Sequence, residues 1–239
     1  MQAVDQQHIT IRRSAERGLA DHGWLRSRHT FSFAEYYDPA HMGFQSLRVI
    51  NDDRVAAGGG FPEHPHRDME IFSYVLEGSL AHRDSLGNER TLKPGQIQLM
   101  SAGTGVRHSE FNPSNTDATH FLQVWIQPRT SGLSPTYTEW HPDDKNQNSP
   151  KVLVISPDGR EGSACIQQDV SIYRLRLKTG ESVSHELIAD HALWLQIASG
   201  SGEFHAIPLG AGDGASATIP GAFTLTASTP LEALLFDFQ

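Results

Sequence analysis

Turn-forming residues interrupt this sequence at short intervals, and this spacing limits its fold more than any other feature. The segments between the turns are rich in β-branched and aromatic residues, as in Met69–Leu76 and His120–Gln127. Apart from a turn or two near Ser14–Gly18, no long stretch keeps a helical period. The pattern predicts an all-β sandwich or barrel of antiparallel strands. The interrupting residues include Asn51-Asp52-Asp53, Gly58-Gly59-Gly60, Glu77-Gly78, Lys93-Pro94-Gly95, Asp158-Gly159 and Pro220-Gly221.

The sequence changes character between Pro128 and Pro150. Proline and polar residues dominate this stretch, and short β-like segments resume after it. Such a composition is typical of an exposed connection between domains. The predicted organisation is therefore an N-terminal domain over residues 1–128, a linker over 129–150 and a C-terminal domain over 151–239.

Composition excludes several classes of protein. The 239 residues include 19 Lys and Arg against 28 Asp and Glu, a formal net charge of −9, and no basic run stands out, which argues against direct binding to nucleic acid. No apolar run of about 18 residues could span a bilayer. The single cysteine, Cys165, cannot form an internal disulfide and suits a reducing compartment. We expect a cytoplasmic protein with no membrane contact.

Two pairs of side chains have the spacing of metal ligands. His64 and His66 lie two residues apart, as do His108 and Glu110. On a β-strand, residues i and i+2 point to the same face, so two such pairs on neighbouring strands would direct three imidazoles and a carboxylate at one centre. This donor set suits a borderline divalent metal with open positions for water, dioxygen or substrate. The set does not choose among iron, manganese, nickel, cobalt, copper and zinc.

A single His-x-His pair carries little weight, because thirteen histidines in one chain produce close pairs by chance. The second pair, within a matching glycine frame, makes the metal interpretation the stronger one. In the C-terminal half, His185 and His191 are six residues apart, and no second ligand pair follows them. We therefore predict a C-terminal domain of the same fold without a metal, with an apolar interior.

The glycine frame resembles the motifs of the cupin superfamily. Gly58, His64, His66, Glu70 and Gly78 are spaced much as in the first cupin motif, with one extra residue before the last glycine. A Gly-x-Gly-x-x-His sequence that ends at His108 is similar to the second motif. Within the cupins, the resemblance is to the pirin family. The stretches that carry it are His29–Phe33, Tyr36–Pro39, Leu47–Asp53, His64–Glu70 and Ser101–Glu110.

This resemblance implies a bicupin, in which two antiparallel β-barrel (jelly-roll) domains pack together. It implies one divalent transition metal per chain, with Fe(II) favoured, held by His64, His66, His108 and Glu110. By the same resemblance Glu70 is not a ligand, and its carboxylate is as readily explained by orienting a ligand imidazole as by any catalytic role.

Bacterial pirin-like proteins resemble quercetin 2,3-dioxygenases, which cleave a flavonol with dioxygen. The resemblance implies that Glu110 takes the flavonol hydroxyl proton and that the metal lowers the pKa of that hydroxyl. Phe31, Phe33 and Phe44 are candidates to stack on a planar substrate. The expected partners are a flavonol-like aromatic molecule and dioxygen, and the expected state is a monomer.

The alternative function is a metal-dependent binding or regulatory protein without physiological turnover, as eukaryotic pirin relatives are thought to be. The two functions differ in what surrounds the metal. A pocket that opens onto the metal would favour the enzyme, whereas a closed site beside a flat charged face would favour the regulator.

Overall fold

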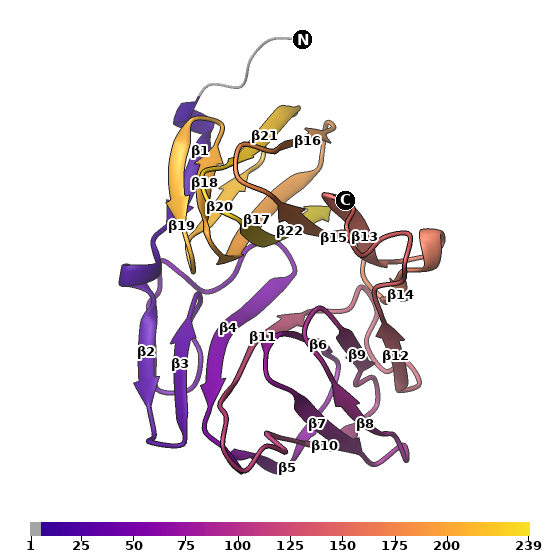
Figure 1. Cartoon of the computed structure of the whole chain (residues 1–239). Coiled ribbons are helices and arrows are strands. Elements are labelled where there is room, and N and C mark those ends of the chain that lie inside the picture. Colours follow the sequence, from indigo (N-terminus) through magenta and orange to yellow (C-terminus); the bar gives the residue numbers. More distant parts are fainter. Residues whose placement is uncertain (1–5) are drawn as a thin grey trace. The chain divides into compact units, whose positions relative to one another are not determined.

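The computed structural model describes residues 6–239, and their regular structure is almost entirely β-strand (Figure 1). The helices in this range are three single 3-10 turns, at Gln6–His8, Ser14–Glu16 and Arg160–Gly162. Over residues 6–239 the chain therefore contains no helix that is long and apolar enough to cross a membrane.

The chain folds into two compact units, which interleave along the sequence. The N-terminal unit comprises residues 17–142 and 164–168, and the C-terminal unit takes the rest of the described chain, residues 6–16, 143–163 and 169–239. The two units thus exchange two short segments. The sequence-based division into 1–128, 129–150 and 151–239 gives each domain one continuous stretch and stays a prediction.

The N-terminal unit consists of two antiparallel sheets. The larger sheet has the strand order β12 (Thr136–Trp140), β9 (Ile97–Ser101), β6 (Glu70–Glu77), β11 (Thr119–Ile126), β4 (Leu47–Val55), β3 (Leu25–His29) and β2 (Gly18–Asp21). The smaller sheet has the order β5 (Gly60–His66), β10 (Val106–Phe111), β7 (Leu80–Asp84) and β8 (Glu89–Leu92). The short strand β14 (Ala164–Cys165) belongs to the exchanged segment of this unit.

Strand β6 shows how the core of this unit is built. Side chains alternate across a strand, and Ile71, Ser73 and Val75 form one face of β6. Val75 packs with Leu80 of the smaller sheet, and Ser73 donates a hydrogen bond to Glu110 of β10. This face of β6 therefore looks into the space between the two sheets, where the candidate site lies.

The C-terminal unit repeats the two-sheet plan. The strands that this unit contributes to its larger sheet have the order β1 (Ile9–Arg12), β20 (Gly214–Ala217), β17 (Ala192–Ser199), β22 (Leu231–Phe238), β15 (Val170–Leu177) and β13 (Lys151–Ser156). Its smaller sheet has the order β16 (Ser182–Leu187), β21 (Gly221–Ala227), β18 (Ser201–Phe204) and β19 (Ile207–Gly210). Buried apolar side chains fill the space between them, among them Leu175, Leu195, Phe204, Phe223 and Leu235.

The all-β, two-cupin class is confirmed, but the expected closed barrels are not. In the N-terminal unit the outer strands of the larger sheet, β12 and β2, do not pair with β5 or β8 at the margins of the smaller sheet. A barrel requires continuous hydrogen bonding around its circumference, whereas a double-sheet jelly roll buries the same apolar faces without closing.

Replacing Gly103 with alanine should destabilise the N-terminal unit. Gly103 has a φ of 45°, and a Cβ there would lie 2.1 Å from the carbonyl oxygen of Leu133. We expect a loss of about 2–5 kcal/mol in unfolding free energy, because a left-handed backbone costs about 1–2 kcal/mol and overpacking about 1–3 kcal/mol. Denaturant unfolding followed by tryptophan fluorescence measures this loss.

The matched control is Gly132→Ala. Gly132 also has a positive φ of 74°, but a Cβ there would meet no atom within 4 Å. The unfolding free energy of this variant should fall by only about 1–2 kcal/mol, the cost of the left-handed backbone. Equal losses in the two variants would contradict the argument from the Leu133 contact.

Candidate metal centre

Three histidines converge between the sheets because β5 and β10 pair in a specific register. His108 lies opposite His64, and Val106 lies opposite His66. The Nε2 atom of His108 is 3.1 Å from Nε2 of His64 and 3.0 Å from Nε2 of His66. The structure thus brings together three of the four predicted ligands at one point.

These distances are compatible with one ion bound by all three nitrogens. With metal–nitrogen bonds of about 2.1 Å, adjacent ligands of an octahedron lie about 3.0 Å apart, against about 3.4 Å in a tetrahedron. Two imidazole nitrogens this close need either a proton or a metal ion between them. One shared proton would serve a single pair, whereas a metal would serve all three nitrogens.

The protonation of the rings also suits a metal. His64 Nδ1 is 2.8 Å from the carbonyl oxygen of Pro62 and must donate to it, which leaves the Nε2 lone pair for the cluster. Burial, followed by the neighbouring imidazoles, lowers the pKa of His66 to about 4 and that of His108 to about 3. The His66 and His108 rings are therefore neutral at physiological pH, which is the form that binds metals.

Glu110 lies beside this cluster but is more deeply buried. It follows His108 by two residues on β10, and its side chain has no exposed surface. Its Oε1 accepts hydrogen bonds from Ser73 Oγ at 2.7 Å and Gln98 Nε2 at 2.9 Å, and its Oε2 accepts one from Gln123 Nε2 at 2.8 Å. Oε2 accepts one hydrogen bond and retains a lone pair, so metal ligation by Glu110 stays a prediction.

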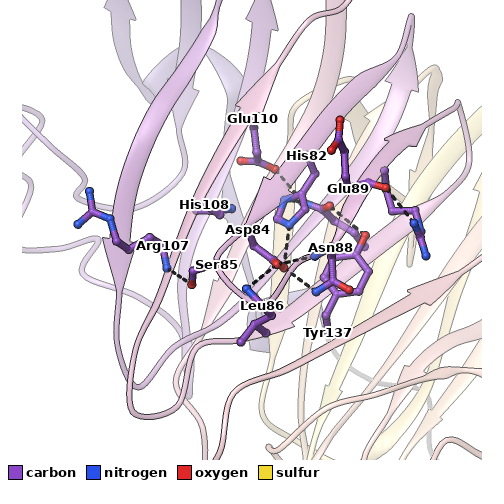
Figure 2. Close-up of polar contacts among 12 residues, drawn as sticks. His82, Asp84, Ser85, Leu86, Asn88, Glu89, Arg107, His108, Glu110 and Tyr137 are labelled. Carbon is purple, nitrogen blue, oxygen red and sulfur yellow. Dashed lines mark hydrogen bonds and ion pairs between the residues drawn. The ribbon is translucent and has the colours of Figure 1, made fainter.

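His82 is a neighbour that the sequence did not single out. Its ligand atoms group with those of His108 and Glu110 within 4.8 Å. However, its Nδ1 accepts a hydrogen bond from Gln98 Nε2 at 2.9 Å. Its Nε2 donates to Asp84 Oδ2 at 3.2 Å (Figure 2). Because both ring nitrogens are engaged, His82 is less available to a metal than the three convergent histidines.

Asp84 is held by the turn that follows β7. Its carboxylate accepts hydrogen bonds from the amides of Leu86 and Asn88 and from the Asn88 side chain (Figure 2). Burial alone would raise the pKa of Asp84, but these bonds and the contact with His82 outweigh burial and lower it. A fixed, ionised Asp84 explains the orientation of His82.

Glu70 lies on the other face of β6 from Ser73, because the two positions differ by three residues. Its Oε2 accepts hydrogen bonds from Ser101 Oγ at 2.6 Å and from the backbone amide of Gln167 at 3.1 Å. The chain between His66 and Glu70 is not a regular strand, since Asp68 has a positive φ of 49°. Among the described contacts, Glu70 orients no histidine ring; it anchors Gln167 of the exchanged segment.

A cavity of about 340 Å³ adjoins the histidines, and His64 and His66 form part of its wall. Of the three phenylalanines named as candidates, Phe33 lines the cavity, whereas Phe31 and Phe44 are not among the described lining residues. Sequence reasoning missed Trp125, whose ring packs edge-on against His66 at 4.8 Å between centroids. The alternation of side chains between the two faces of β11 was the sequence signal that could have identified Trp125. Most of the wall surface is apolar, although eight of the thirteen residues that line the cavity are polar.

Asn51-Asp52-Asp53, interpreted above as a turn, lies inside β4 instead, so that prediction was wrong. The polar side chains are accommodated by partners on neighbouring elements. Asn51 Oδ1 is 2.8 Å from His29 Nδ1, and Asp52 Oδ1 is 2.7 Å from His120 Nε2. Asn51 and Asp53 both line the cavity. Because these cross-strand partners are distant in the sequence, no pattern among neighbouring residues predicts the pairs.

The two-sheet units and the convergent histidines define a two-domain cupin protein with a candidate metal centre. A family model named Pirin matches residues 10–126, and one described as "Quercetinase C-terminal cupin domain" matches residues 153–238. The chain belongs to the pirin family.

Relatives with known names cover nearly the whole chain. Quercetin 2,3-dioxygenase of Escherichia coli (strain K12) is 47% identical over 229 residues, which span 96% of this chain and 98% of the relative. A pirin-like protein of Caulobacter vibrioides is 39% identical over 92% of this chain and 95% of its own. The crystal structure of the bacterial pirin YhhW from Escherichia coli in complex with nickel(II) has a TM-score of 0.90 and 46% identity, covering 96% of this chain and 98% of that one.

Proposed function

We propose that this protein is a metal-dependent dioxygenase of the quercetin 2,3-dioxygenase type, which cleaves a flavonol with dioxygen. The observation that carries the proposal is the cavity of about 340 Å³ whose wall includes His64 and His66. Its volume lies within the range of about 300–1,000 Å³ usual for small-molecule sites. The names of the relatives support the same substrate class.

In this proposal His64, His66, His108 and Glu110 hold one divalent metal. When bound, the metal lowers the pKa of a substrate hydroxyl and polarises it for reaction. The protein's own contribution is to bind and orient the substrate. Phe33 and Trp125, whose rings meet edge-to-face at 5.4 Å between centroids, offer apolar surface to a planar ring system. The apolar wall also excludes water from the reacting group.

Further parts of the sequence-based prediction belong to this proposal. Three imidazoles and a carboxylate are compatible with Fe(II), which we favour among the metals named above. The single cysteine supports a cytoplasmic location. The acidic net charge argues against direct contact with nucleic acid, and a monomer remains the expected state.

The alternative, a regulatory protein without turnover, receives less support. It was expected to have a closed metal site beside a flat charged face. A mostly apolar cavity that reaches two of the three convergent histidines favours the enzyme instead.

Metal analysis followed by an aerobic assay tests the proposal. The purified protein should contain about one divalent metal per chain. Loaded with Fe(II), it should consume dioxygen and bleach quercetin, and removal of the metal by a chelator should abolish both signals. A metal-loaded protein that leaves quercetin intact would contradict the proposed activity. A content near two metals per chain would contradict the prediction for the C-terminal unit.

A further inference from the structure

Asp53 is a buried carboxylate at the wall of the cavity. It lies on β4, opposite Ser27 of β3 and Phe121 of β11, and only 1% of its surface is exposed. Ser27 bonds to this carboxylate. Its Oδ1 has no hydrogen-bond partner among the residues that the structure describes. An unpaired buried oxygen of this kind is costly, so its presence beside a cavity calls for a ligand.

The other polar groups near the cavity differ from Asp53. Asn51 Oδ1 accepts a hydrogen bond from His29. Glu63 is exposed and pairs with Arg107 at 2.8 Å. Glu110 accepts three hydrogen bonds from protein side chains and is not among the lining residues. Of the carboxylates that line this cavity, Asp53 is the one that is both buried and short of a partner.

The surroundings of Asp53 also favour proton uptake near neutral pH. Burial raises the pKa of Asp53 to about 7, partly offset by the hydrogen bond from Ser27. The negative charges of Asp52 and Glu110 raise it further, and Arg17 lowers it. A carboxylate with a pKa near the working pH is well matched to the role of general base.

We propose that Asp53 binds the acidic hydroxyl of a planar aromatic ligand in this cavity and accepts its proton. The ligand O–H bond breaks, a bond forms between the proton and Oδ1, and the electron pair stays on the ligand oxygen. The inference rests on the proposed function and deepens it, because it assigns to Asp53 the proton that the family resemblance assigned to Glu110.

Ligand binding without dioxygen tests the inference. The probes are 3-hydroxyflavone and flavone, which differ by the hydroxyl, titrated anaerobically against metal-loaded protein and followed by absorbance. Asp53→Asn should weaken binding of 3-hydroxyflavone about 10–100-fold, the range for loss of a hydrogen bond to a charged group. Binding of flavone should change by no more than about threefold. Metal content should equal that of the wild type.

Glu77→Gln is the control, since it removes an exposed carboxylate that pairs with Arg54 and does not line the cavity, and it should leave the binding of both probes unchanged. Asp53→Ser, a smaller replacement, should give the same selective loss as Asp53→Asn. An equal loss for both probes would indicate a damaged cavity and overturn the inference. Unchanged binding in the Asp53 variants, or a wild type that does not distinguish the probes, would overturn it too.

Aerobic turnover of quercetin separates this inference from the proposed function. If binding depends on Asp53 and on the hydroxyl but the loaded wild type consumes no dioxygen, the dioxygenase proposal fails and the role of Asp53 stands. If the wild type cleaves quercetin and Asp53→Asn binds both probes normally, the role of Asp53 fails and the dioxygenase proposal stands.

Discussion

Replacing His108 with alanine is expected to remove the metal and reduce flavonol cleavage to the level of the metal-free protein. His108 is central to the cluster, because its Nε2 lies within 3.1 Å of the Nε2 atoms of both His64 and His66. Without His108 the proposed site keeps two imidazoles and the Glu110 carboxylate, which already accepts three hydrogen bonds, and we expect this set to bind the metal too weakly to retain it. Metal content by mass spectrometry and quercetin turnover provide the two measurements.

His120→Ala is the control for this substitution. His120 is also buried, but its ring pairs with Asp52 at 2.7 Å and belongs to neither candidate metal group in the described chain. The same change of size there should lower stability and leave the metal bound. A His108→Ala protein that folds and keeps a full equivalent of metal would disprove the proposed centre.

The second large effect is expected for Glu110→Gln. Glu110 accepts three hydrogen bonds, and a glutamine would turn one acceptor oxygen into a donor that faces other donors. We expect loss of metal affinity and nearly complete loss of flavonol cleavage. Stability should also fall by about 1–3 kcal/mol, because buried polar groups lose their partners. Metal titration, turnover and thermal unfolding measure these effects.

Glu70→Gln provides the comparison between the two carboxylates. Glutamine retains an oxygen that can accept from Ser101 and the Gln167 amide, so folding should survive. Metal should remain bound, and activity should fall by no more than about 100-fold. The reverse pattern, in which Glu70→Gln loses metal and Glu110→Gln keeps it, would show that the ligand assignment is wrong.

The sequence was most informative where the relevant contacts are local or periodic. Frequent turns predicted the all-β class, and the i, i+2 spacing predicted that His64 and His66 share a strand face. The register of β5 against β10 then depends on pairing between segments about forty residues apart, as His64 and His108 illustrate. The glycine frame around the two ligand pairs predicts this register only indirectly.

What the sequence missed depends on contacts between distant strands. Asp53 was assigned to a turn because consecutive Asn and Asp residues, as in Asn51-Asp52-Asp53, are common in turns. In the structure Ser27 lies beside it on β3, so a polar residue is accommodated within a sheet. Closure of the sheets was overestimated for a related reason. Alternating apolar residues indicate a buried face, but they do not tell whether the outer strands of two sheets meet.

The position of β1 has a consequence for how the protein is made. Ile9 pairs with Ala217, so a segment that precedes residues 17–142 in the sequence forms the outer strand of a sheet whose other strands follow those residues. Residues 17–142 can fold while β1 waits unpaired, and closure of so long a loop is slow. A truncation that removes Ile9–Arg12 keeps the N-terminal unit whole, but it exposes the hydrogen-bonding edge of β20 to pairing with other chains. A shortened N-terminus is thus a route to aggregation through the unit that lacks the predicted metal ligands.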